Sequence, residues 1–287
     1  MKKDKTHIHW YPGHIAKAER QLKEQLKLID VVIEVLDARI PISSTYNDIK
    51  KLLGDKPRFL LLNKSDLVDP QEIKEWVAYL REQTGCKVLL SDGKNSFNFN
   101  KIIDTAVSLA EPKIQALMAK GLLRRPARVM VCGMPNVGKS SIINRLTRSS
   151  KTKTGAKAGV TRQQQWVRIN PKLELLDTPG IIPTKQDDQD AAAKLAMVSS
   201  VSENAYTPEF VAKELLGLLD NKYPEIVRGF YKVVDGDLTL ESVAVARNWI
   251  KAGAEADVER TARYILRDFR DGMIGKFILD DIMKEAI

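Results

Sequence analysis

The sequence predicts an α/β fold with a mostly parallel sheet, followed by a smaller domain made only of helices. Three observations support this prediction. Short apolar runs alternate with helical patterns before residue 184, a glycine-rich loop stands between a run and a helix, and only helical patterns follow. Alternating strands and helices form parallel sheets that are covered on both faces. We therefore expect one domain over residues 1–184 and a second over residues 185–287.

Each predicted strand is a short, mostly apolar run, and the runs at 31–36 and 59–62 are typical of buried strands. These runs are residues 31–36, 59–62, 88–90, 128–132, 167–169 and 173–176. Apolar residues spaced three or four positions apart predict helices between them. The helices expected in the first domain are residues 15–28, 73–83, 102–119 and 141–146.

The second domain is expected to begin after a polar segment, residues 185–190. Thr207 and Pro208 indicate a helix start, because threonine caps helices well and proline fits the first helical position. Helical spacing then covers residues 209–219, 240–252 and 257–269.

The chain of 287 residues has a net charge of +9, and this charge is unevenly distributed. Residues 112–172 contain fourteen lysines and arginines but no aspartate or glutamate. Such a run often forms only a solvated face, but its length favours a surface that contacts RNA or DNA phosphates. No apolar stretch has the length of a membrane span, and no signal-peptide pattern is present. We expect a cytoplasmic monomer.

A phosphate-binding loop is predicted at residues 133–140, GMPNVGKS, which match GxxxxGK[ST] between a strand and a helix. The glycines let backbone amides turn toward a phosphate, and the helix N-terminus favours the anion. Lys139 should bridge the β- and γ-phosphates, and Ser140 should bind Mg²⁺. The other residues of this region expected to contact the nucleotide are Asn136, Val137, Gly138 and Ser141.

Two segments after this loop are candidates for sensing the γ-phosphate. Asp177 begins the sequence DTPG at a predicted strand end, where its carboxylate can reach Mg²⁺ through water. Gly180 is the last residue of that sequence, and its backbone amide can contact the γ-phosphate. Thr161 lies between the two motifs, and its hydroxyl is the candidate switch ligand of Mg²⁺. We expect Lys139, Thr161 and Gly180 to act on the reacting phosphate.

The sequence NKSD, residues 63–66, predicts which base is bound. The carboxylate of Asp66 can accept two hydrogen bonds from guanine, whereas adenine lacks that pair of donors. Lys64 can lie along the base, and Asn63 can tie this segment to the phosphate-binding loop. Ser91, after the next strand, is a further candidate base contact, although Asp92 follows it where alanine is usual. GTP and GDP are therefore the expected ligands.

The order of these motifs indicates a circularly permuted P-loop GTPase domain. NKSD precedes GMPNVGKS here, whereas it follows the phosphate-binding loop in Ras-like GTPases. Permutation at exposed connections keeps the same strands paired in one sheet. The chain also contains WYPGHIAKA at residues 10–18, DARIP at residues 37–41 and RDFRDGMIGK at residues 267–276.

Together these motifs resemble the circularly permuted GTPases of bacterial ribosome assembly, the YlqF family, over nearly the whole chain. Met273 and Ile274 depart from the Arg-Leu of that family's ending. The resemblance implies GTP hydrolysis coupled to late maturation of the large ribosomal subunit. It also implies that the C-terminal helices contact ribosomal RNA.

The group that positions the attacking water is not evident from the nucleotide motifs. Ile181 stands where Ras-like enzymes carry the glutamine that does so. The resemblance makes His14 the candidate, because imidazole can orient or deprotonate water near neutral pH. A helix-capping or phosphate-facing role for His14 is the alternative. Asn136 occupies the position that binds K⁺ in potassium-activated GTPases, which predicts K⁺ as a further cofactor.

We expect hydrolysis to be slow in isolation and stimulated by the ribosome. Two other functions stay open at this point. One is a nucleotide-gated RNA-binding scaffold with little catalysis, which Ile181 favours. The other is a GTPase of another RNA-linked pathway, such as tRNA modification or protein targeting, which fits the basic stretch equally well.

Overall fold

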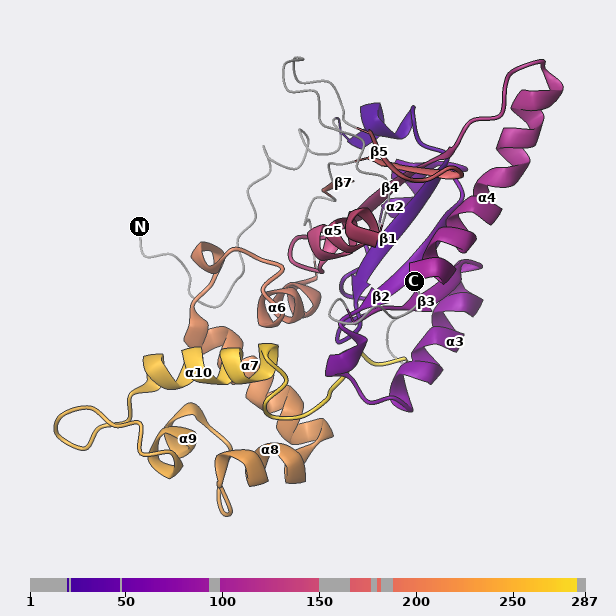
Figure 1. The fold of residues 1–287 in the computed structure, drawn as a ribbon. Helices are drawn as coiled ribbons and strands as arrows, with labels where there is room; N and C mark the ends of the chain where they lie inside the picture. Colours follow the sequence, from indigo (N-terminus) through magenta and orange to yellow (C-terminus); the bar gives the residue numbers. More distant parts are fainter. Residues whose placement is uncertain are drawn as a thin grey trace.

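The computed structural model describes residues 20, 22–46, 48–92, 99–149, 166–176, 180–181 and 188–282, with only the backbone at 149, 180 and 181. Within these residues, helices flank one twisted sheet, and the C-terminal helices gather beside it (Figure 1). The predicted α/β class and the helical C-terminal part are confirmed. The predicted boundary between residues 184 and 185 lies outside the described residues. Of the predicted helix 15–28, residues 20 and 22–28 are described. Residues 20 and 22–26 are helical, whereas 27 and 28 form a turn.

The seven-stranded sheet has the order β3-β2-β1-β4-β6-β5, with the short β7 beside β4. All pairs are parallel except β5 with β6. β1 is buried along its whole length, as expected for a central parallel strand. The six predicted strands are present, and β7 is an addition. Their bounds are Val31–Asp37 (β1), Arg58–Asn63 (β2), Lys87–Leu90 (β3), Ala127–Gly133 (β4), Trp166–Asn170 (β5), Leu173–Leu176 (β6) and Gly180–Ile181 (β7).

Helices cover both faces of this sheet because alternate residues of each strand point to opposite sides. Leu60 and Leu62 of β2 belong to one buried cluster with residues of α3, while Phe59 and Leu61 belong to another with residues of α4 and α5. The helices of this part are α2 (Ile49–Leu53), α3 (Glu72–Thr84), α4 (Phe99–Ala119) and α5 (Lys139–Ser149). The short α2 was not predicted.

The C-terminal part contains more helices than the sequence predicted. They are α6 (Gln189–Met197), α7 (Pro208–Lys222), α8 (Pro224–Tyr231), α9 (Leu240–Ala246) and α10 (Val258–Arg270). Thr207 caps α7 and Pro208 starts it, as predicted, although the Thr207 side chain makes no capping hydrogen bond. The prediction for residues 247–252 was wrong, because Asn248 takes a left-handed φ of 56° and the chain turns into a bridge between Ile250 and Ala256.

After α10 the chain returns to the sheet. The amide of Phe277 donates to the carbonyl of Leu67, and the amide of Leu279 donates to the carbonyl of Arg39 at 2.8 Å. Ile278 is fully buried in the cluster that contains α3. The segment after α10 is therefore anchored to the segments that follow β1 and β2. No helix among the described residues has the length and apolar composition needed to cross a membrane.

Candidate nucleotide-binding site

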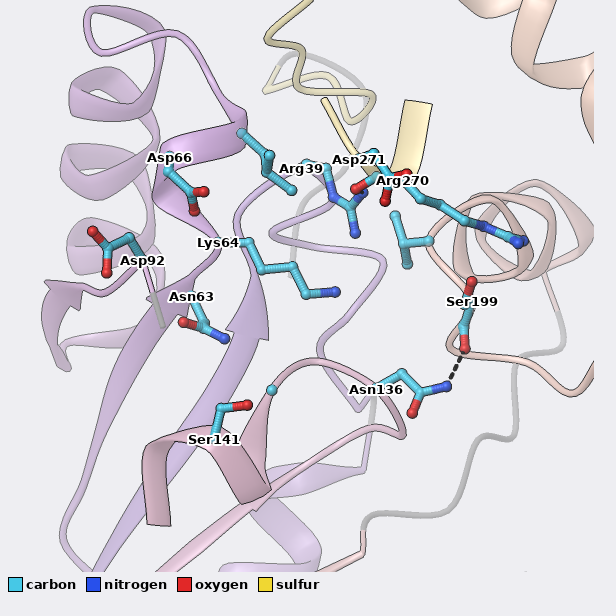
Figure 2. Close-up of a pocket in the computed structure, with 13 residues that line it drawn as sticks. Arg39, Asn63, Lys64, Asp66, Asp92, Asn136, Ser141, Ser199, Arg270 and Asp271 are labelled. Carbon is cyan, nitrogen blue, oxygen red and sulfur yellow. Dashed lines mark hydrogen bonds between the residues drawn. The ribbon is translucent and has the colours of Figure 1, made fainter. Parts of the chain in front are cut away.

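A cavity of about 600 Å³ opens at the carboxyl ends of β1 and β2. Ligands of parallel sheets bind at this end, and the volume suits a small molecule. Both NKSD and the phosphate-binding loop line it (Figure 2). The lining residues are Arg39, Asn63, Lys64, Asp66, Leu67, Asp92, Asn136, Gly138, Ser141, Val198, Ser199, Arg270 and Asp271.

Asn63 joins the two segments, as predicted. It is the last residue of β2, which pairs in parallel with β1, and its side chain is almost fully buried. Its Nδ2 donates to the carbonyl oxygen of Val137 at 2.8 Å. Gly138 lies directly against it, because a Cβ at Gly138 would collide with that same Nδ2. NKSD and the phosphate-binding loop therefore fit together in this way only with glycine at this position.

The phosphate-binding loop connects β4 to α5. Lys139 begins α5 and is 7% exposed, and its Nζ donates to the carbonyl oxygen of Met134 at 2.6 Å. Burial lowers the pKa of Lys139 to about 8. The ammonium thus lies inside the loop, where a phosphate would also be bound. Ser140 is exposed in the first turn of α5.

Asn136 joins the phosphate-binding loop to the helical part of the chain. Its backbone has a left-handed φ of 58°, and its Nδ2 donates to the carbonyl oxygen of Ser199 at 2.6 Å. Figure 2 shows this bond at the edge of the cavity. The carbonyl oxygen is the atom of Asn136 that can serve as a cation ligand, because a side-chain amide accepts only through its oxygen, and the bond to Ser199 fixes the orientation of that amide.

Lys64 makes a contact that the sequence did not predict. It was expected to lie along the base, and its Nζ donates to Oδ2 of Asp37 at 2.7 Å. Arg39 also binds Asp37, with Nε donating to Oδ1 and Nη2 to Oδ2, both at 2.9 Å. Burial alone would raise the pKa of Asp37, but the charges of Arg39 and Lys64 hold it well below its usual range.

The C-terminal helices contribute one wall of the cavity. Val198 and Ser199 follow α6, and Arg270 and Asp271 end α10. The side chain of Arg270 donates to the carbonyl oxygens of Ala196 and Met197, each at 2.9 Å, and so joins these two helix ends. This wall was not predicted from the sequence. The one sequence feature that could have indicated it is the motif at residues 267–276, which had been used for the family resemblance but given no structural role.

The remaining predicted residues differ in what the structure describes. Ser91 supports NKSD through its backbone, since its amide donates to Leu62 and its carbonyl accepts from Ser65. Its neighbour Asp92, rather than Ser91, lines the cavity. The backbone of Gly180 pairs with Cys132 in β7, beside the strand that leads into the phosphate-binding loop. His14, Thr161 and Asp177 lie outside the described residues.

The described residues fit part of a magnesium site. The hydroxyl of Ser140 is exposed where α5 begins, next to the buried ammonium of Lys139. A hydroxyl is a ligand that Mg²⁺ accepts beside substrate phosphates. The other two predicted ligands, Thr161 and Asp177, belong to segments that the structure does not describe. Within the described residues, no three His, Cys, Asp or Glu side chains form a group that could hold a metal ion.

Sequence comparisons find the same similarity along almost the whole chain. A family model described as "50S ribosome-binding GTPase" matches residues 128–227, so NKSD precedes the matched range. Ribosome biogenesis GTPase A from Priestia megaterium is 39% identical over 279 residues, which are 96% of each chain. The protein of that name from Thermotoga maritima is 31% identical, over 94% of this chain and 92% of its own.

Solved structures are similar in fold over comparable lengths. The crystal structure of GNP-bound YlqF from T. maritima has a TM-score of 0.66 and 27% sequence identity, over 94% of this chain and 100% of that one. The GDP-bound structure of the same protein has a TM-score of 0.64 and 25% identity, over 91% and 98% of the two chains. The permuted order of elements is therefore shared with known structures.

Proposed function

Because this chain belongs to the ribosome biogenesis GTPase A family and is a GTPase, we propose that it couples GTP hydrolysis to late assembly of the large ribosomal subunit. One observation supports this proposal above the others. Asn63 of NKSD bonds directly to Val137 of the phosphate-binding loop, at the wall of one cavity. A guanine recognised by Asp66 and phosphates bound by the loop then belong to one nucleotide.

Within this proposal each motif has a defined task. Asp66 accepts hydrogen bonds from guanine, and Lys139 neutralises the β- and γ-phosphates. Ser140, Thr161 and Asp177 would hold Mg²⁺, the last through water, and the ion would neutralise phosphate charge. Asn136 would ligate K⁺ through its carbonyl oxygen.

The proposed hydrolysis needs a group that orients water, because Ile181 cannot. We assign this task to His14, whose neutral imidazole can hydrogen-bond to the attacking water. The reaction is expected to be slow until the ribosomal subunit fixes the geometry.

Ribosomal RNA is the proposed partner of the C-terminal helices, in the cytoplasm and with the protein as a monomer. On α10, Arg260 and Arg267 lie 5.2 and 4.6 Å from the ring centroid of Tyr264, and both arginines are exposed. Arginine and aromatic side chains on one surface suit phosphates and unstacked bases.

The acid-free stretch supports RNA binding less than its composition indicates. Lys113 and Arg125 pair with Asp30, and Arg124 pairs with Glu111, so acids outside the stretch neutralise part of it. The proposal of RNA binding therefore relies on Arg260, Arg267 and Tyr264 of α10, of which Arg267 also pairs with Asp268 at 3.5 Å.

The test is the rate of GTP hydrolysis with and without purified large ribosomal subunits, in KCl and in NaCl. We expect strong stimulation by the subunits, greater in KCl, and binding that weakens steeply as salt rises. An identical rate with and without subunits would contradict the coupling. His14→Ala should abolish most of the stimulation and leave GTP affinity near normal, whereas His9→Ala serves as the control. Unchanged stimulated turnover in His14→Ala would remove His14 from the reaction.

A further inference from the structure

Asp37, Arg39 and Lys64 form a cluster of charged side chains beside the base-binding end of the cavity, and none of the tasks above uses it as a unit. Asp37 is fully buried, Arg39 is 2% exposed and Lys64 is 23% exposed. Arg39 binds both carboxylate oxygens of Asp37, and the Nζ of Lys64 shares Oδ2 with it at 2.7 Å. Lys64 is the residue of NKSD whose stem can lie along a base. The carboxylate of Asp37 thus fixes the far end of that stem.

The same arginine contacts the C-terminal helices. Its Nη1 donates to the carbonyl oxygen of Arg270 at 3.4 Å, at the end of α10. Its guanidinium lies 5.3 Å from the ring centroid of Phe269, and its own carbonyl accepts from Leu279 of the returning tail. Within this cluster, Arg39 is therefore the side chain that contacts both α10 and Asp37, the residue that binds Lys64. Figure 2 shows Arg39 and Lys64 on one side of the cavity, beside Arg270 and Asp271.

The contacts continue around the cavity to the phosphate end. Arg270 bonds through its side chain to the carbonyl oxygens that end α6. Ser199, two residues after α6, accepts from Asn136 of the phosphate-binding loop at 2.6 Å. A continuous series of contacts thus runs from Lys64 through Asp37, Arg39, α10 and α6 to the phosphate-binding loop.

Stability alone does not explain a buried cluster of this kind. Burying an ion pair costs desolvation, and well-packed apolar residues often stabilise a protein as well or better. Such a cluster contributes geometry instead, because its charged groups have few alternative positions once they are desolvated. A side chain held in its bound position before the ligand arrives loses less entropy on binding.

We propose that Asp37 and Arg39 are positioning residues of the guanine site, which hold Lys64 in place and couple guanine-nucleotide binding to the docking of α10. The inference rests on the proposed guanine site. Nucleotide that packs on Lys64 favours the intact cluster, and the intact cluster favours α10 against Arg39. Coupling of this kind is reciprocal, so a docked α10 also raises nucleotide affinity.

The test compares two arginines of similar burial. Arg39→Met removes the guanidinium that binds both carboxylate oxygens of Asp37. Arg58→Met is the control: Arg58 pairs with buried Glu34, which lies in β1 as Asp37 does, but Arg58 does not line the cavity. The measurements are GDP affinity by calorimetry, thermal unfolding, and hydrogen exchange of α10 with and without GDP. Arg39→Met should bind GDP about tenfold more weakly and lose the protection that GDP gives to α10. Arg58→Met should lower the melting temperature but keep GDP affinity and protection.

Arg39→Lys and Asp37→Asn keep the test decisive if Arg39→Met does not fold. Arg39→Lys retains the positive charge but cannot bind both carboxylate oxygens of Asp37 at once, and it should recover part of the GDP affinity. Equal losses of affinity in Arg39→Met and Arg58→Met, or unchanged protection of α10 in every variant at Asp37 and Arg39, would overturn the inference. Failure of the wild-type chain to prefer GDP over ADP would instead contradict the proposed function.

Discussion

At Gly138 the phosphate-binding loop touches the side chain that ties it to NKSD. Its φ of +102° is unfavourable for other residues, and a Cβ would collide with Nδ2 of Asn63. Gly138→Ala should therefore break the bond between Asn63 and Val137 and weaken GDP binding at least about tenfold. Gly217→Ala is the matched control, because Gly217 lies in α7 with open space around its Cβ position.

The two alanine substitutions should change the stability of the protein in opposite directions. Gly217→Ala is expected to stabilise the protein by up to about 1 kcal/mol, since alanine favours a helix over glycine. Gly138→Ala should lower both GDP affinity in calorimetry and the melting temperature. Normal GDP affinity in Gly138→Ala would show that the contact with Asn63 does not shape the site.

Asp30 predicts a pH dependence of stability. Burial would raise its pKa, but hydrogen bonds from Arg125 and Lys113 and from the amide of Arg128 lower it to about 2. A carboxyl group with a lowered pKa stabilises the folded state above its unfolded pKa, and the gain is lost as the pH falls toward the folded value. Asp30→Asn should therefore cost about 2 kcal/mol of unfolding free energy at pH 7 and much less near pH 2.

Urea unfolding at several pH values checks this expectation. Asp48→Asn is the control, because Asp48 pairs with Lys51 at the exposed surface and such pairs contribute little. A loss in Asp30→Asn that stayed constant from pH 7 to pH 3 would contradict the ionic origin of the effect.

One contact expected from the sequence is present and another differs. Asn63 was expected to tie NKSD to the phosphate-binding loop, and it does. The partner of Lys64 was missed, because Asp37 ends a different strand and only the pairing of β1 with β2 brings it close. Arg39 was recognised only as part of the motif DARIP, and no contact or function was predicted for it.

Among elements, the strands were predicted most accurately. The bounds of β1 to β6 match the predicted ones within one residue at each end. Continuous apolar runs explain this for β1, β2 and β4, which are buried along almost their whole length, whereas β5 is largely unburied. The short helices were missed for physical reasons. α8 begins at Pro224 directly after α7 ends, and α6 holds seven consecutive buried residues, so it shows no amphipathic spacing.

The returning tail gives a prediction at the same scale. The carboxylate of Asp280 is 1% exposed, accepts from the amides of Ile42 and Ser43 and from the Ser43 hydroxyl, and pairs with Lys194 of α6 at 3.0 Å. Asp280→Ala leaves buried Lys194 without this partner, and should cost about 3 kcal/mol of unfolding free energy.

The neighbouring residue provides the control for the tail. Asp281 is 43% exposed, and pairs with Lys222 at 3.4 Å, so Asp281→Ala should change stability little. Urea unfolding of the two variants measures the difference. Equal stability of Asp280→Ala and Asp281→Ala would mean that the tail does not fasten α6 to the sheet.

For the whole molecule, motif order and sheet order together explain the permuted site. NKSD follows β2, the phosphate-binding loop follows β4, and β1 lies between them in the sheet. This much was predictable, because parallel strands present their carboxyl ends at one edge. The wall formed by α6 and α10 was not, since it depends on how distant helices pack.

The most direct measurement of the central claim is calorimetry of GDP, ADP and XDP binding, in Mg²⁺, to the wild-type chain and to Asp66→Asn. One site made by NKSD and the phosphate-binding loop predicts that the wild type binds GDP at least about a hundredfold more tightly than ADP. It also predicts that Asp66→Asn shifts this preference to XDP. Equal affinity of the wild type for GDP and ADP, or an unchanged preference in Asp66→Asn, would contradict it.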